Sequence, residues 1–214
     1  MDRSPLINET LEQQLRTVLG QLRSPVTVVC LTDGSEKCGE MLLFLHHLAA
    51  LCPLLTLKIL SPGEDAGIDA LLDAGMLPAA GLWNADGFGR MVFHGVPGGH
   101  ELTSFISAVL ACGGSAKPLD GPTLRDISKI SADATVQICV SLACTHCAKL
   151  VMAAHRIAAE NEHICAHMID ANLYPALVSR YRIERVPVLT VDGAVAAVGG
   201  MTLAELCALL RKKR

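Results

Sequence analysis

The sequence carries no large excess of charge of either sign. Lysine and arginine together number 18 against 21 aspartates and glutamates, which gives a net charge of −3. Nucleic-acid binding is not expected, because it needs a basic face that this balance does not supply. The closing run Arg211-Lys212-Lys213-Arg214 is interpreted as cations at the end of a last helix, where the helix dipole favours positive charge.

An export signal and a membrane span are also missing from the pattern. Met1 to Pro5 shows no charged segment followed by an apolar one, as a signal peptide would. Met41 to Leu60 is mostly apolar and about as long as a membrane span. Pro53 interrupts this stretch and ends a helix, so we predict a helix over residues 36–52, a strand over 54–60 and no membrane association.

The dinucleotide-binding motif G-x-G-x-x-G is absent as well. The nearest glycine groups, Gly87 with Gly89 and Gly98 with Gly99, lack both the spacing and the strand-to-helix setting of that motif. We therefore expect no bound cofactor, and in particular no FAD or NADPH held by that route.

Cysteine, by contrast, is plentiful, with nine residues in a chain that is 51% hydrophobic. The number is odd, and the chain is long enough to build a core without disulfide cross-links. Cys30, Cys139 and Cys207 lie in apolar segments, where free cysteine behaves as a small hydrophobic residue. A reducing compartment is predicted on this basis, and the expected location is cytoplasmic.

One pair of cysteines stands where a strand pattern gives way to a helix. Cys144-Thr145-His146-Cys147 follows the β-branched run Val136–Val140 and leads into Ala148–Ala154, a segment free of glycine and proline. Cys144 is thus expected at a helix N-terminus, where the helix dipole stabilises a thiolate. Cys147 lies one helical turn further on and can resolve a mixed disulfide. The pattern predicts a redox-active dithiol.

Two other interpretations stay open for these cysteines. A Cys-x-x-Cys pair binds zinc in some proteins, together with further cysteines or histidines. His163, Cys165 and His167 alternate as on one face of a strand, so a zinc site that joins them to Cys144 and Cys147 is the first alternative. The second is that the cysteines are incidental. Our expectation is that no metal is bound.

The chain contains an internal repeat with an offset of 109 residues. The offset superimposes three pairs of residues: Ser35 on Cys144, Cys38 on Cys147, and Pro78 on Pro187. Each copy is predicted to follow the order β-α-β-(α)-β-β-α. Further helices are predicted before each copy, over 8–22 and 121–131, and the copies are predicted to end in helices over 100–112 and 201–213. Residues 113–118 form the linker, so we predict two α/β domains, 1–115 and 116–214.

The first copy lacks the attacking thiol, because Ser35 stands where Cys144 stands in the second copy. A serine cannot form the disulfide, so the first domain is predicted to be redox-silent, with Cys38 as a buried packing residue. A thiol that takes up glutathione or cross-links is the alternative for Cys38.

The order of elements, with a dithiol after the first strand and a proline opening the third, resembles the thioredoxin/glutaredoxin fold. In that superfamily the proline is cis and faces the dithiol, and the residue before it offers its backbone to an extended substrate. The resemblance assigns this substrate-docking role to Val186 and Pro187. It makes Pro78 the equivalent proline of the first copy. An ordinary trans proline at a strand edge is the alternative.

A narrower resemblance covers nearly the whole chain from about residue 8. The tandem with only its second dithiol intact is similar to the N-terminal domain of the flavoprotein component of bacterial alkyl hydroperoxide reductase. The matching segments are Gly99–Ser104, Ser141–Cys147, Val186-Pro187, Asp192-Gly193 and Gly200–Leu203. The resemblance implies two thioredoxin-like domains merged into one compact body. It also marks Glu101, which lies close to the dithiol in that family, as a candidate proton relay; an ordinary first-turn helix acid is the alternative.

The resemblance further implies a thiol–disulfide oxidoreductase that passes electrons through Cys144 and Cys147. The implied donor is a flavoprotein disulfide reductase, and the acceptor is a peroxiredoxin or another disulfide protein. The family's nucleotide-binding domains are missing here, so we expect a free-standing shuttle, with an excised fragment as the alternative. A broad-specificity protein disulfide oxidoreductase is the second functional hypothesis, and a zinc-binding or docking module without turnover is the third.

His146 lies between the two cysteines, where an imidazole stabilises a neighbouring thiolate and with it the reduced form. We therefore predict a redox potential less negative than that of thioredoxin (about −270 mV) but short of that of a strong oxidant (about −120 mV). A solvated loop histidine is the alternative interpretation.

Overall fold

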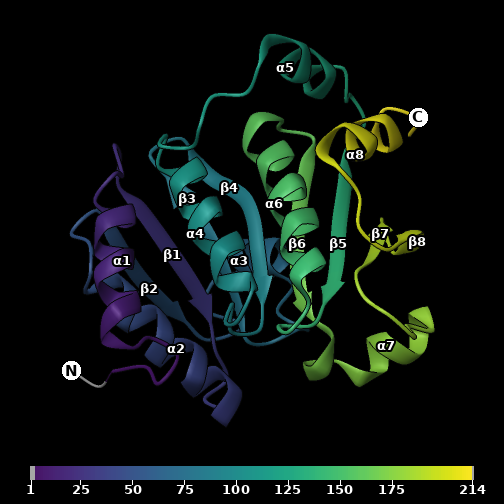
Figure 1. The fold of residues 1–214 in the computed structure, drawn as a ribbon. Coiled ribbons are helices and arrows are strands. Elements are labelled where there is room, and N and C mark those ends of the chain that lie inside the picture. Colours follow the sequence, from purple (N-terminus) through teal and green to yellow (C-terminus); the bar gives the residue numbers. More distant parts are fainter. Residues whose placement is uncertain (1–2, 214) are drawn as a thin grey trace.

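The computed structural model describes residues 3–213, in which two lobes share one β-sheet (Figure 1). The first lobe contains α1 (Glu9–Leu19), β1 (Val26–Leu31), α2 (Glu36–Ala49), β2 (Leu55–Leu60), α3 (Ala66–Leu72), β3 (Ala79–Asn84), β4 (Gly87–His94) and α4 (Glu101–Cys112). The second contains α5 (Gly121–Ser128), β5 (Ala134–Val140), α6 (Thr145–Glu160), β6 (Ile164–Asp170), the short 3-10 helix η1 (Ala171–Leu173), α7 (Pro175–Tyr181), β7 (Val188–Val191), β8 (Ala194–Val198) and α8 (Leu203–Leu210).

The 109-residue repeat holds in the structure. The first residues of α6, β6, α7 and β7 lie 109 positions after those of α2, β2, α3 and β3, so equivalent positions of the two lobes are paired along these elements. The last helix is shorter than the predicted 201–213. It begins after Thr202, whose side chain and that of Glu205 form a reciprocal capping box, an arrangement that fixes a helix N-terminus.

The predicted transition within the long apolar stretch is also present. The helix α2 ends at Ala49, Pro53 follows, and strand β2 begins at Leu55. None of the helices in the described part of the chain combines the length and the apolar character that a membrane crossing needs.

The two lobes join through their strands. The sheet runs in the order β2-β1-β3-β4-β6-β5-β7-β8, and the seam is a parallel pairing of β4 with β6, from Met91 opposite Ala166 to His94 opposite Ile169. The prediction of two thioredoxin-like units merged into one body is confirmed. The domain boundary at residues 115 and 116 stays a prediction, because sheet and core continue across the seam.

The largest hydrophobic core extends through both lobes on the face of the sheet that α1, α2, α4 and α6 cover, and two smaller clusters lie against α3 and α7. The helices α4 and α6, one from each lobe, run side by side over the seam (Figure 1). Beneath them the fully buried ring of Phe105 makes edge contacts with Phe93 at 4.9 Å and with Phe44 at 6.0 Å between centroids. Packing of this kind adds to the burial of apolar area. Phe93 also contacts His155 of α6 at 4.6 Å between centroids, so the cluster joins α4 and α6, and the starts of both helices carry candidate site residues.

Candidate active site

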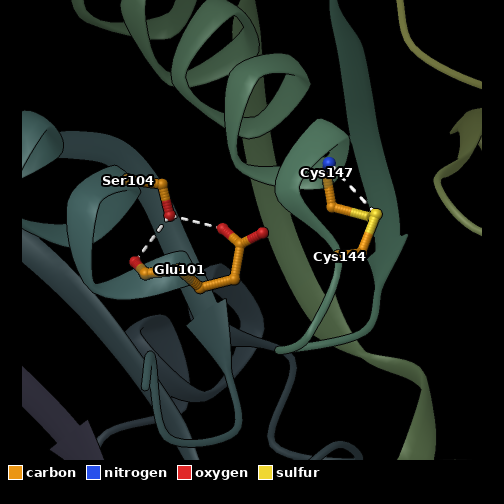
Figure 2. The surroundings of a disulfide bond; sticks show 4 residues. All are labelled: Glu101, Ser104, Cys144 and Cys147. Carbon is orange, nitrogen blue, oxygen red and sulfur yellow. Dashed lines mark hydrogen bonds between the residues drawn. A yellow bond between two sulfur atoms is a disulfide. The ribbon is translucent and has the colours of Figure 1, made fainter. Parts of the chain in front are cut away.

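The dithiol pair occupies the junction that the sequence predicts. Strand β5 ends at Val140, and Cys144 is the N-cap residue of α6, with extended backbone angles. Its sulfur accepts a hydrogen bond from the backbone N–H of Cys147 at 3.3 Å. The two cysteines form a disulfide, with their Cα atoms 5.4 Å apart (Figure 2). A sulfur in this position faces the unpaired N–H groups and the positive end of the helix, both of which favour a thiolate after reduction.

The two sulfurs differ in accessibility. Cys147 is fully buried in the first turn of α6, whereas Cys144 is only partly buried. An incoming disulfide can therefore reach Cys144 first, and Cys147 lies behind it, in position to attack a mixed disulfide from inside the protein.

A cis peptide bond joins Val186 to Pro187, immediately before β7. The carbonyl of Pro187 accepts from Gly199 at 2.8 Å, while the partly exposed Val186 lines a groove of about 380 Å³ together with Ser141. Ser141 leads directly to the dithiol, because its carbonyl accepts from the N–H of Cys144 at 2.9 Å. Val186 and the start of the loop that leads to Cys144 thus line one groove, while the docking role of Val186 and Pro187 stays a prediction.

Glu101, from the first lobe, reaches the same place through a glycine turn. The N–H of His100 donates to the carbonyl of Leu142 at 3.0 Å, which attaches the start of α4 to the loop before Cys144. Gly99 has a φ of 55°, and a Cβ there would lie 2.5 Å from the Leu142 carbonyl oxygen, so only glycine fits. Figure 2 shows the Glu101 carboxylate pointing from α4 toward the cysteine pair.

The environment of Glu101 favours its protonated form. Burial raises the pKa of this carboxyl from 4.5 to about 7, the negative charge of Asp170 adds to the effect, and a hydrogen bond from Ser104 opposes it. That bond runs from the Ser104 hydroxyl to Oε2 at 2.5 Å, while Oε1 is buried and has no partner within residues 3–213. A carboxyl of this kind exchanges a proton near neutral pH, which suits a proton relay.

His146 lies in the first turn of α6 with an exposed side chain. No hydrogen bond or ion pair of its imidazole occurs among the described residues. Its proposed effect on the thiolate therefore rests on its place in the sequence between the cysteines.

The first lobe repeats the backbone of the site without its chemistry. Ser35 is the N-cap of α2, and its hydroxyl accepts from the N–H of Cys38 at 3.4 Å, as Cys144 does from Cys147. Cys38 is fully buried, as expected for a packing residue. The bond between Leu77 and Pro78 is cis, so the predicted equivalence with Pro187 holds in geometry as well as in sequence.

A polar row across the seam could not be expected from the sequence. The Met76 carbonyl, two residues before Pro78, accepts from the hydroxyl of Tyr174 at 3.3 Å and from Nδ1 of His94 at 2.8 Å. Nε2 of His94 then accepts from Nδ1 of His167 at 2.9 Å, and Nε2 of His167 lies 3.3 Å from the sulfur of Cys165. Burial lowers the pKa of both histidines. Tyr174 of the second lobe thus bonds the backbone of the first lobe just before Pro78, at the position equivalent to the predicted docking residues.

The same row bears on the zinc hypothesis. His163 lies just outside β6 and bonds Asp133 at 2.8 Å, whereas Cys165 and His167 contact each other. Within residues 3–213 no group of three or more histidine, cysteine or acidic side chains is arranged to hold a metal ion.

The seven other cysteines are free, and all but the partly buried Cys165 are buried. Burial raises the pKa of the Cys30, Cys139 and Cys165 thiols to about 12 and that of Cys112 to about 11. Thiols with such pKa values are poor nucleophiles at neutral pH. The prediction that Cys30, Cys139 and Cys207 pack as small hydrophobic residues fits their burial.

Comparisons with known proteins agree with this arrangement. A thioredoxin-domain family model matches residues 134–211, the second lobe. The alkyl hydroperoxide reductase F protein of Pseudomonas aeruginosa is 29% identical over 203 residues, which are 95% of this chain and 37% of the relative. The corresponding protein of Escherichia coli is 27% identical over the same shares. The chain thus spans little more than a third of the length of these relatives.

Solved structures extend the match to the whole fold. The N-terminal domain of the alkyl hydroperoxide reductase F protein of Enterococcus faecalis superimposes with a TM-score of 0.90 and 30% identity, over 95% of this chain and 99% of that one. A protein disulfide oxidoreductase from Aeropyrum pernix superimposes with a TM-score of 0.84 over 95% and 92% of the two chains, at 19% identity, a likeness of fold. With its single dithiol at the start of α6, the chain belongs to the family of thioredoxin-like N-terminal domains of alkyl hydroperoxide reductase F proteins, and it is a thiol–disulfide oxidoreductase.

Proposed function

We propose that the chain relays electrons from a flavin-bearing disulfide reductase to a peroxiredoxin or a similar disulfide protein. The observation that carries the proposal is the disulfide at the N-terminus of α6, with one sulfur partly exposed and the other buried. The donor has to be a separate polypeptide or region, because the 214 residues contain no dinucleotide-binding motif. The free thiols elsewhere in the chain support a reducing, cytoplasmic setting.

The proposed reaction proceeds through a mixed disulfide. The thiolate of reduced Cys144 attacks one sulfur of the partner's disulfide, that bond breaks, and the partner's other sulfur leaves as a thiolate. The thiol of Cys147 then loses its proton and attacks the sulfur of Cys144. The first partner sulfur leaves as a second thiolate and takes up a proton, so two electrons have passed and Cys144–Cys147 is oxidised.

Three further residues serve this exchange in the proposal. Glu101 accepts the proton of Cys147, a role supported by its buried unpartnered oxygen and by a pKa raised to about 7 by burial. Val186 and Pro187 hold the extended segment around the partner's cysteine, a role supported by the partly exposed Val186 in the groove that also contains Ser141. Metal binding has no part in this mechanism.

The experiment is a coupled assay with a flavin-dependent disulfide reductase as donor and an oxidised peroxiredoxin as acceptor. Peroxide-dependent consumption of the reductant is expected with the parent chain and is expected to disappear in both Cys144→Ser and Cys147→Ser. A Cys38→Ser variant is the matched control, because the same change in the first lobe leaves the dithiol intact. Unchanged turnover in the Cys144 and Cys147 variants would refute the relay.

A broad-specificity protein disulfide oxidoreductase is the second candidate, supported by the fold it shares with such a protein. Ser35 counts against it, because only one lobe carries a dithiol. Reduction of insulin at a rate comparable with that of the peroxiredoxin would favour this candidate over the specific relay.

A further inference from the structure

Three exposed cations lie in the two segments that carry the dithiol and the predicted docking residues. Lys149 is exposed within the first two turns of α6, and Arg182 and Arg185 are exposed between α7 and β7. Arg185 lines the groove that also contains Ser141 and Val186. Glu184, which lines the same groove, is the one negative charge among residues 182–185. Lys149, Arg182 and Arg185, which we call the cationic rim, thus outnumber the acid Glu184 in these two segments, although the whole chain carries a net charge of −3.

These cations are free to meet a partner. Within residues 3–213 none of Lys149, Arg182 and Arg185 takes part in an ion pair. By contrast, Arg16, Arg156 and Arg211 each bind a carboxylate at 2.8–2.9 Å. Unpaired exposed cations beside a reactive sulfur attract acidic groups over about a Debye length, roughly 10 Å at 0.1 M salt.

The first lobe supplies an internal comparison. At the 109-residue offset Lys149 corresponds to Glu40 and Arg182 to Asp73, and all four side chains are exposed. Asp73 and Arg182 share the same left-handed backbone at the ends of α3 and α7, with φ values of 54° and 50°. The sign of the charge is thus reversed at positions whose backbone is the same.

Helix stability alone does not account for the change from acidic residues in the first lobe to basic residues in the second. A cation at the C-terminal end of α7 is favoured by the helix dipole, but Asp73 stands at the equivalent end of α3, where an anion is disfavoured. Arg185 follows α7 by four residues and caps nothing. Two of the three cations therefore have no helix end to stabilise, and the first lobe tolerates acids where the second has bases.

We propose that this cationic rim selects disulfides flanked by acidic residues, so that the partner of the second lobe presents its cysteine in an acidic segment. The proposal rests on the proposed exchange reaction and specifies the chemistry of its substrate. Arg185 acts from within the groove on the residue beside the partner's cysteine, and Lys149 and Arg182 steer the approach. In the first lobe Glu40 and Asp73 repel such acidic segments from Ser35, which stands where the second lobe has its attacking cysteine.

The test uses three peptide disulfides of equal length, in which the cysteine is flanked by glutamates, glutamines or lysines. The reduced chain converts each to two peptide thiols and becomes oxidised at Cys144–Cys147, and stopped-flow measurement gives the second-order rate constant. At an ionic strength of about 0.01 M, where the Debye length is about 30 Å, we expect the glutamate peptide to react about 10-fold faster than the glutamine peptide. At about 1 M salt, with a Debye length of about 3 Å, the ratio should approach 1.

Charge-reversed variants identify the residues. Arg185→Glu is expected to lower the glutamate-to-glutamine rate ratio at low salt at least about threefold, and Lys149→Glu to lower it less, since steering strength follows local charge. Lys58→Glu is the matched control, because Lys58 is exposed on β2 at the opposite edge of the sheet, and it should leave the ratio unchanged.

The outcomes separate the two proposals. If the glutamine peptide reacts with the parent but the ratio is 1 at low salt, or if Lys58→Glu lowers it as much as Arg185→Glu, the selectivity proposal is wrong and the exchange reaction stands. If none of the three peptides is reduced, the exchange reaction itself fails. An unchanged far-ultraviolet circular dichroism spectrum and urea midpoint of Arg185→Glu show that the variant is folded.

Discussion

Replacing Glu101 by glutamine removes a carboxyl that is buried beside the dithiol. Its side chain has no exposed surface, and burial raises its pKa from 4.5 to about 7. At a pH well below 4.5 the group is neutral in both the folded and the unfolded chain. As the pH rises above that value, the unfolded carboxyl ionises while the folded one keeps its proton, so the unfolded state is favoured. This penalty is complete once the pH exceeds about 7.

The size of the effect follows from the pKa difference. A rise from 4.5 to about 7 corresponds to about 3 kcal/mol of unfolding free energy, since one pKa unit is worth about 1.4 kcal/mol. Glutamine has no such penalty, and its amide oxygen can still accept from Ser104. Glu101→Gln is therefore expected to gain up to about 3 kcal/mol relative to the parent between about pH 4 and pH 8.

Urea unfolding of the two oxidised proteins at about pH 4, 6 and 8 measures this difference. Ser104→Ala supplies a directional check, because the Ser104 hydrogen bond lowers the pKa of Glu101, and its loss should enlarge the penalty at pH 8. Parallel pH profiles for the parent and Glu101→Gln would refute the reasoning. They would mean that Glu101 ionises as freely in the folded chain as in the unfolded one, and the proton-relay proposal would lose its support.

Three further predictions concern single side chains. Ser35→Cys should form a second disulfide, with Cys38, because the Ser35 hydroxyl already occupies the cap position of an attacking sulfur; a mass spectrum that shows only one disulfide after oxidation would contradict this. His146→Ala should have a more negative redox potential than the parent, whose potential we expect between about −270 and −120 mV. Equilibration with glutathione or dithiothreitol measures both potentials, and a parent value more negative than that of thioredoxin would argue against the role of His146. Thr202→Ala should lower the free energy of unfolding by about 1 kcal/mol through loss of the capping box, and an unchanged urea midpoint would show that the cap contributes nothing.

The sequence predicted those parts of the site that depend on residues close together along the chain. A β-branched strand followed by a helix-forming segment placed Cys144 at an N-cap, and the repeat placed Ser35 at the equivalent cap. Both depend on residues within about one helical turn, where capping preferences are strong. The cis geometry of Pro187 came from the family resemblance, since spacing alone does not distinguish cis from trans.

Features that depend on contacts between the two lobes could not be predicted from the sequence. The bond from Tyr174 to the carbonyl of Met76 joins residues 98 positions apart, and it exists only because β4 and β6 pair. The raised pKa of Glu101 likewise includes a contribution from Asp170 of the second lobe. The alternation of His163, Cys165 and His167 correctly predicted a strand, but it could not show that Cys165 and His167 would contact each other.

The central claim is that Cys144 attacks and Cys147 resolves. Its most direct test incubates the reduced Cys144→Ser and Cys147→Ser variants with the oxidised disulfide partner and examines the products by mass spectrometry without reductant. The account predicts a covalent adduct of Cys147→Ser, joined through Cys144, and none of Cys144→Ser, because Cys147 is fully buried behind Cys144. An adduct formed by Cys144→Ser, or by neither variant, would contradict it.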